Sequence, residues 1–131
     1  TVDKLFDIES FKQVHQMVST VKCELKNDTT FKNSIDATFP MASMTGAPKI
    51  RAMELIDEYE VYNRNAYSGT IGYIDENGNF ELSVLIRSIF YNEEKKYLSF
   101  TVGSAITSMA NAEDEYEECL LKAKAMMQVL S

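Results

Sequence analysis

Residues 67–107 alternate between short apolar segments and polar turns, and this pattern constrains the fold more than any other feature. Residues 67–74 are rich in β-branched and aromatic side chains, and residues 75–78 (Asp-Glu-Asn-Gly) carry the Asn-Gly signal of a hairpin turn. Residues 80–87 alternate apolar and polar side chains with a period of two. A second polar turn precedes residues 97–107. The pattern therefore predicts an antiparallel meander of three strands.

Helices are expected on both sides of this meander in the sequence. The last, at residues 112–130, has Asn111 as its N-cap, and its predicted buried stripe consists of Tyr116, Leu120, Ala123, Met127 and Leu130. Earlier helices are predicted at residues 30–37 and 48–58, after a strand within residues 14–25. This order predicts an α+β fold, in which helices pack on one face of an antiparallel sheet.

Composition excludes some classes of partner. The 131 residues suit one domain or part of one, and no repeat or linker marks a boundary. The formal net charge of −7 argues against nucleic acid or an anionic membrane as the main partner. No apolar run approaches the length of a membrane span. The two cysteines form no CxxC pair and are predicted to be free thiols in a reducing cytoplasm.

Glu115 and Glu118 form the first candidate site. Their i, i+3 spacing places both carboxylates on one face of the last predicted helix. Two such carboxylates can hold Mg²⁺ together with water and substrate oxygens. The alternative is that these side chains only favour the positive end of the helix dipole, and the spacing alone does not decide.

Residues 45–49 (Thr-Gly-Ala-Pro-Lys) form the second candidate site. They lead into a predicted helix, with Thr45 as its N-cap and Pro48 in the first turn. A helix N-terminus favours anions, and a hydroxyl, a glycine and a lysine there suit a carboxylate. A helix that is merely well capped explains the same residues.

Three further positions carry weaker signals. Arg87 is predicted in the middle of an apolar strand, where it lies on the solvated face or clamps a carboxylate. Gly103 within the third predicted strand marks a bulge or the close approach of a ligand. His15 is the only histidine, and a lone histidine is more often structural than catalytic. None of these residues is decisive alone.

Taken together and in order, the segments resemble those of the chorismate-utilising enzymes. The resemblance covers essentially the whole chain, and its most specific part is Thr-Gly-Ala-Pro-Lys at residues 45–49 with the helix that follows. The matching segments are residues 15–20, 39–40, 43–54, 64–73, 86–88, 103–106, 115–118 and 122–123. The resemblance implies that residues 1–131 are the C-terminal portion of a chorismate-binding catalytic domain, the C-terminal half of an anthranilate synthase component I-like α/β sandwich.

The resemblance also implies roles for the candidate residues in binding. Glu118 corresponds to a direct Mg²⁺ ligand, and Glu115 to a ligand through water or to a neighbour of the metal. The metal grips the ring carboxylate of chorismate and fixes the ring for loss of the C4 hydroxyl. Arg87 and Tyr67 correspond to a clamp on the enolpyruvyl carboxylate.

The family's ring-carboxylate site and its catalytic residues carry over in the same way. The resemblance implies that Thr45 and Gly46 lie against the ring carboxylate. It also implies that Thr45 and His15 are catalytic residues. His15 resembles a histidine near the reacting ring face, where it assists proton transfer or orients a leaving group. The backbone that completes the carboxylate site is implied to be that of Gly103, Ser104 and Ala105.

Two segments favour one branch of the family. Residues 43–46 read Ser-Met-Thr-Gly, which fits the aminodeoxychorismate pattern of Ser, any residue, Thr, Gly, and Arg64-Asn65 fits it too. The implied reaction is replacement of the C4 hydroxyl of chorismate by ammonia from a glutamine amidotransferase partner, on the route to p-aminobenzoate and folate. Anthranilate synthase component I is one alternative. The other is a non-catalytic module that binds a ligand or a protein partner.

Several positions depart from the family pattern. Met41-Ala42 stands where a Gly-Gly pair is common, Ser104-Ala105 replaces glycines, and Met109 replaces a common aspartate. Family enzymes are also much longer, and the part that has no counterpart here carries another metal-binding glutamate pair and a lysine typical of the aminodeoxychorismate branch. We therefore expect that this chain is an incomplete fragment that does not turn over chorismate alone.

Overall fold

The computed structural model describes residues 1–11 and 15–131, which group into two compact units, Thr1–Phe39 and Pro40–Ser131. In the first unit, β1 (Val2–Ser10) and β2 (His15–Val21) form an antiparallel hairpin in which Ser10 pairs with His15. Val14, where the predicted strand begins, lies outside the described residues. α1 (Phe31–Thr38) follows, and the Thr30 hydroxyl caps it by accepting from the Asn33 amide at 3.2 Å.

The second unit begins with two helices, α2 (Ala42–Thr45) and α3 (Lys49–Tyr59). The prediction of a plain loop before α3 was wrong at its start, because α2 is a short helical turn. Thr45 is not the N-cap of α3, which is Pro48, with no side-chain cap. The Thr45 hydroxyl instead donates back to the Met41 carbonyl at 3.2 Å, a local bond that a threonine inside a helical turn readily forms.

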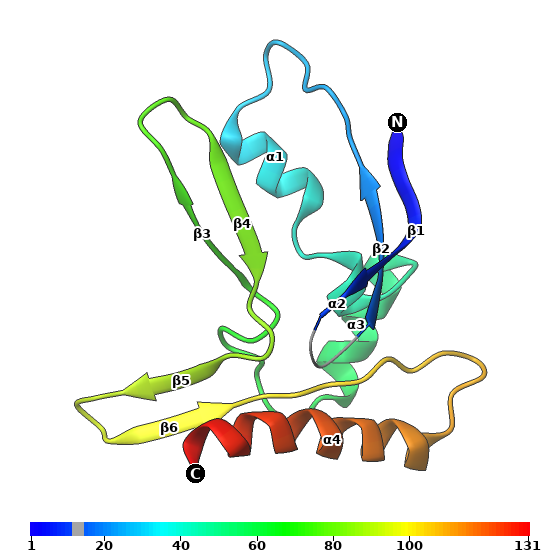
Figure 1. Ribbon diagram of the computed structural model, residues 1–131, viewed down its shortest axis with the longest axis vertical. Helices are drawn as coiled ribbons and strands as arrows, with labels where there is room; N and C mark the ends of the chain where they lie inside the picture. Colours follow the sequence, from blue (N-terminus) through cyan, green and yellow to red (C-terminus); the bar gives the residue numbers. More distant parts are fainter. Residues whose placement is uncertain (12–14) are drawn as a thin grey trace. The chain divides into compact units, whose positions relative to one another are not determined.

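Two separate hairpins replace the predicted three-stranded meander. β3 (Thr70–Ile74) pairs with β4 (Phe80–Val84), and β5 (Ile89–Asn92) pairs with β6 (Tyr97–Phe100), both antiparallel (Figure 1). The predicted Asn-Gly turn is confirmed, with Gly78 at φ 82°. The strand β5 was missed by the sequence pattern.

Arg87 and Gly103 therefore lie outside the strands in which they were predicted. The ladder ends because the Ile86 amide bonds the Val84 carbonyl at 2.9 Å, which turns the chain away, and Arg87 then adopts φ 51°. β6 ends at Phe100, so Gly103 belongs to the irregular segment after it. Both residues are thus on connecting segments, where functional side chains are common.

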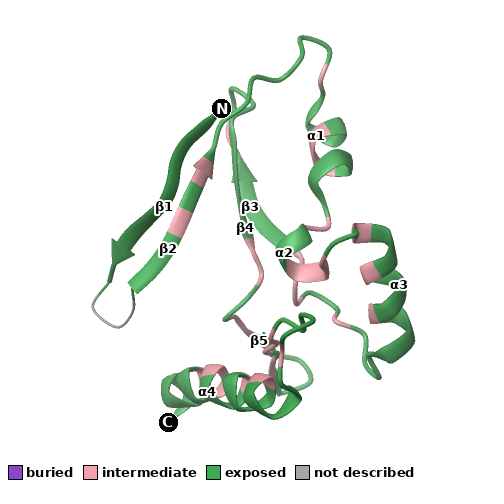
Figure 2. Ribbon diagram, turned by 90° about the vertical axis from the view of Figure 1, so that its right-hand side faces the viewer, coloured by how far each residue is buried: buried purple, intermediate pink, exposed green. Residues whose placement is uncertain are grey.

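The last helix, α4 (Ala112–Leu130), has the predicted bounds and cap, since the Asn111 side chain accepts from the amides of Glu113 and Asp114. Most of its predicted buried stripe was wrong: Tyr116 is 59% exposed and Met127 is 61% exposed, and only Ala123 is half-buried. The half-buried side, pink in Figure 2, consists of Glu115, Cys119, Lys122, Ala123 and Met126. Polar contacts join the helix to the segment after β6, and most of the predicted apolar stripe is exposed.

Antiparallel strands combined with helices confirm the predicted α+β class. None of the described residues is fully buried, and the ribbon in Figure 2 is coloured only as intermediate or exposed where it is described. Large apolar side chains are exposed on most elements. Among the described residues, no helix has the length and apolarity that crossing a bilayer requires.

Candidate functional site

The half-buried side of α4 carries Glu115, with the exposed Glu118 next to it at i+3, and meets the segment after β6. The Ser104 hydroxyl donates to the Glu115 carboxylate, and the Lys122 ammonium donates to the Gly103 carbonyl at 2.8 Å. Lys122 also pairs with Glu118 at 2.5 Å, one helical turn earlier. These contacts join residues 103–104 to α4, so two segments that the resemblance selected lie side by side (Figure 1).

The pKa of Glu118 lies below its usual range. The hydrogen bond from Lys122 is the largest cause, followed by the positive charge of Lys122, and the Ser104 hydroxyl lowers the pKa further. Ser104 therefore lies close to both carboxylates, because it donates to Glu115 and also favours ionised Glu118. The local environment keeps Glu118 charged, which a metal ligand requires.

These groups fit part of a magnesium site. Mg²⁺ is commonly bound through one or two carboxylates, with water or substrate oxygens at the remaining positions. Glu115 and Glu118 supply two carboxylates, and the described residues contain no cluster of three or more His, Cys, Asp or Glu side chains. Lys122 occupies one oxygen of Glu118, so a metal there competes with the ammonium or shares the carboxylate with it.

Tyr67 comes close to the other side of the segment after β6. A Cβ atom added to Gly103 would lie 2.7 Å from the Tyr67 hydroxyl, well inside van der Waals contact. The glycine therefore allows a close approach by the Tyr67 side chain, and the predicted approach of a ligand stays a prediction. Predicted ligand-binding residues from two parts of the chain are brought together here.

Thr45 and Gly46 are joined to the turn that carries Tyr67 through Arg64. The Arg64 guanidinium donates to the Met44 carbonyl at 2.6 Å, directly before Thr45. Gly46 has φ 119°, a conformation that side-chain-bearing residues rarely adopt, and its added Cβ would lie 3.1 Å from that of Ala52. The Gly46 amide donates to the Ala42 carbonyl at 2.8 Å and is thus already used within α2.

Arg87 is exposed and forms no hydrogen bond or ion pair with the part of the chain that the structure describes. Arg87 follows Leu85 by two residues. Two backbone hydrogen bonds hold Leu85 to the Tyr67 turn: the Ser68 amide donates to the Leu85 carbonyl at 3.0 Å, and the Leu85 amide donates to the Gly69 carbonyl at 2.9 Å. A planar guanidinium with all donors free is suited to bidentate binding of a carboxylate.

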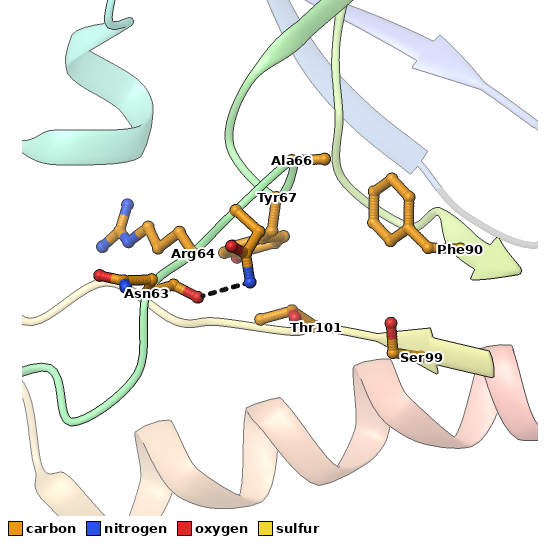
Figure 3. Close-up of a pocket in the computed structure, with 8 residues that line it drawn as sticks. Asn63, Arg64, Ala66, Tyr67, Phe90, Ser99 and Thr101 are labelled. Atoms are coloured by element: carbon orange, nitrogen blue, oxygen red, sulfur yellow. Dashed lines mark hydrogen bonds between the residues drawn. The ribbon is translucent and has the colours of Figure 1, made fainter. Parts of the chain in front are cut away.

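A hollow of about 240 Å³ adjoins the Tyr67 turn. Figure 3 shows it between that turn, Phe90 of β5, and the end of β6. Its lining residues are Asn63, Arg64, Asn65, Ala66, Tyr67, Phe90, Ser99 and Thr101. Tyr67 is the only predicted site residue among them, so the hollow covers one edge of the candidate site.

His15 belongs to the Thr1–Phe39 unit and is exposed. Its Nδ1 lies 2.9 Å from the Ser10 hydroxyl across the end of the β1–β2 hairpin, which is a local contact. Its predicted place near a substrate stays a prediction.

Sequence reasoning missed Arg64 and Lys122 as parts of the candidate site. Both carry a signal that could have been used, because each stands four residues after a glutamate on a helix or at its end. The tertiary contacts that give them importance, with Met44 and Gly103, have no such signal. Lys122 and Arg64 each join a local ion pair to a distant backbone carbonyl.

Comparison with known proteins identifies relatives over nearly the whole chain. The family described as chorismate binding enzyme matches residues 1–128. The chain is 43% identical over 124 residues to the chloroplastic aminodeoxychorismate synthase of Arabidopsis thaliana, covering 95% of this chain and 13% of the relative. It is 37% identical over 129 residues to anthranilate synthase component 1 of Acetivibrio thermocellus, covering 98% of this chain and 26% of that protein.

A solved structure agrees in fold. Anthranilate synthase component I from Streptococcus pneumoniae superposes with a TM-score of 0.85 at 35% identity, over 96% of this chain and 28% of that chain. The chain thus spans between 13% and 28% of the length of these three relatives.

Proposed function

The chain belongs to the chorismate-binding enzyme family, and on that premise we propose that it is part of an aminodeoxychorismate synthase, component I type. The reaction is amination of chorismate at C4, which replaces the hydroxyl with an amino group. The observation that carries this proposal is the higher identity to the aminodeoxychorismate synthase, 43%, than to the anthranilate synthase, 37%. The Ser-Met-Thr-Gly sequence at residues 43–46 supports the same branch.

The carboxylate clamp of this proposal consists of Arg87 and Tyr67. Arg87 has a guanidinium without a partner in the described chain, and the backbone bonds between residues 68–69 and Leu85 keep its segment beside the Tyr67 turn. Arg87 donates in a bidentate manner to the enolpyruvyl carboxylate, and the Tyr67 hydroxyl adds a third bond. Thr45, Gly46 and the backbone of residues 103–105 receive the ring carboxylate.

The metal site of this proposal uses Glu115 and Glu118 as two ligands of Mg²⁺. Bound there, the metal supplies positive charge that neutralises the ring carboxylate and holds it in place. Ser104 orients Glu115, and Lys122 lowers the pKa of Glu118. Further ligands come from water, from substrate, and from the rest of the enzyme, because the described residues supply only a carboxylate pair.

The proposal extends to what lies outside this chain. A glutamine amidotransferase supplies the ammonia, and His15 assists proton transfer at the reacting ring face. The 131-residue chain alone does not turn over chorismate, since the described residues offer a partial metal site and no buried core to hold it.

The test incubates chorismate, Mg²⁺ and excess ammonium with the full-length natural protein that contains this segment, and in parallel with the 131-residue chain. Products are identified by chromatography and mass. We expect aminodeoxychorismate from the full-length protein only, and no product when EDTA removes the metal. Turnover by the shorter chain would refute the incomplete-site argument.

Anthranilate synthase is the second candidate, favoured by the TM-score of 0.85 to an anthranilate synthase component I. Anthranilate as the product of the full-length protein overturns the branch assignment and keeps the family. A full-length protein that binds chorismate without any product supports the non-catalytic module instead.

A further inference from the structure

Arg64 contacts three segments of the Pro40–Ser131 unit with one side chain. Its Nε donates to the Glu60 carboxylate at 2.8 Å, and its Nη2 pairs with the second oxygen of the same carboxylate. Its Nη1 donates to the Met44 carbonyl at 2.6 Å and lies 3.4 Å from the Ser68 hydroxyl. The Arg64 side chain is only 23% exposed, whereas the Arg51–Glu54 ion pair of the same unit is largely solvated.

The segments that Arg64 joins are the two that the proposed function assigns to substrate. Met44 directly precedes Thr45 and Gly46, and Ser68 directly follows Tyr67. Ser68 has φ 63°, so the turn that presents Tyr67 is held in an unfavourable backbone conformation. Arg64 supplies bonds on both sides, to the end of α2 and to the strained turn, and Figure 3 shows it beside Tyr67.

The geometry depends on a guanidinium. Arginine presents five donors in a rigid planar fork, so two can bind Glu60 while a third points elsewhere in a fixed direction. Glu60 fixes the plane of the fork, and the hydrogen bond to Glu60 also raises the pKa of Arg64 above its ordinary value. A lysine ammonium at this position lacks the planar fork, so it cannot reproduce the paired bonds to Glu60 and the directed bond to Met44 together.

We infer that Arg64, oriented by Glu60, is a positioning residue that sets the Thr45–Gly46 segment against the Tyr67 turn and thereby shapes the binding site for the substrate carboxylates. This inference rests on the proposed function. Arg64 acts through the backbone of Met44 and the Ser68 turn and does not itself touch substrate.

A purely local role is the competing explanation, because Arg64 and Glu60 are also an i, i+4 pair at the end of α3. The chain contains a matched pair with only that role. Arg51 and Glu54 within α3 form an i, i+3 ion pair at 2.9 Å, with side chains 60% and 57% exposed and no polar contact with another segment of the described chain. Arg51→Ala therefore serves as the control.

The first experiment measures steady-state kinetics with chorismate in the full-length natural protein. We expect Arg64→Ala to raise the KM for chorismate about tenfold or more, since small misplacements of a binding group cost up to about 100-fold. Arg64→Lys should not restore KM, whereas millimolar guanidinium added to Arg64→Ala should restore part of it. Arg51→Ala should leave KM unchanged. A mere loss of folded enzyme lowers apparent kcat and leaves KM unaltered, so an unchanged KM in Arg64→Ala overturns the inference.

The second experiment uses no chorismate, which separates this inference from the proposed function. Hydrogen–deuterium exchange compares the same variants at the amides of Gly46, Ser68 and Gly69. Arg64→Ala should exchange faster at all three, with Arg51→Ala unchanged; equal exchange overturns the inference. If the unsubstituted protein neither binds nor turns over chorismate, the proposed function and the substrate role of Arg64 fail together, and exchange still decides whether Arg64 joins the two segments.

Discussion

Two sides of α4 differ in what they present and in what covers them. One side carries Glu115, Cys119 and Lys122, is half-buried, and meets residues 103–104 through charged hydrogen bonds. The apolar side, rotated about a third of a turn around the helix axis from the first, carries Tyr116, Leu120 and Met127, which are 45% to 61% exposed. An ordinary amphipathic helix has the reverse arrangement. The polar side therefore sets the position of α4 within this unit, and the apolar side is available to another surface.

Glu118→Gln tests the polar side most severely. In the full-length protein we expect kcat/KM for chorismate to fall about 100-fold, the upper range for groups that support a metal site, with partial recovery at high Mg²⁺. Glu117→Gln is the control, because Glu117 is the adjacent residue, is exposed, and has no partner among the described residues. Steady-state rates at several Mg²⁺ concentrations measure both. Equal losses in the two variants would contradict the metal-ligand role.

Ser104→Ala should have the next largest effect. It removes the hydroxyl that orients Glu115, a hydrogen bond to a charged group worth about 1.5–3 kcal/mol, so the Mg²⁺ concentration for half-maximal rate should rise about tenfold. Ser108→Ala, in an exposed turn where the Ser108 side chain forms no hydrogen bond with the described chain, is the control and should change nothing. A Ser104→Ala enzyme with normal Mg²⁺ dependence would separate the segment after β6 from the metal site.

The same contrast explains which parts of the fold the sequence could predict. Elements bounded by local signals were predicted well: Asn111 caps α4 through its own side chain, and the Asn-Gly turn sets the β3–β4 hairpin. The burial of α4 was predicted wrongly, because periodicity identifies an apolar stripe and cannot tell whether a partner surface is present. Arg87 was misplaced for a related reason, since the alternation of apolar residues continues past Val84 although the ladder has ended.

The candidate site shows the same division between local and tertiary information. The family resemblance selected Ser104 and Glu115 separately, and the structure joins them by a hydrogen bond. The link from Lys122 to the Gly103 carbonyl spans 19 residues and could not be predicted from spacing. The site assignments of His15, Thr45 and Arg87 stay predictions.

Lys122→Met should change the titration of Glu118. Lys122 is the main reason that the pKa of Glu118 is low, so its removal should raise that pKa, as measured by carbon-13 NMR of the carboxyl. Because the pKa is lowered in the folded state, the stabilisation is present above the unfolded-state pKa and is lost as the pH falls through the folded-state pKa. The variant should therefore lose less stability on acidification. Lys124→Met is the control, since Lys124 lies on the same helix without a partner in the described chain.

Leu120→Ser should have the smallest effect on the site, because Leu120 lies on the apolar side of α4 and is 45% exposed. In the 131-residue chain it should leave the titration of Glu118 unchanged and reduce binding of a hydrophobic dye, since it removes exposed apolar surface. Ala123→Ser on the half-buried side should not reduce dye binding. In the full-length protein we expect a larger loss of stability for Leu120→Ser, about 2 kcal/mol or more if another surface buries this side chain. If Leu120→Ser costs the same stability in the 131-residue chain and in the full-length protein, the apolar side of α4 stays exposed and its sequence pattern serves no packing role.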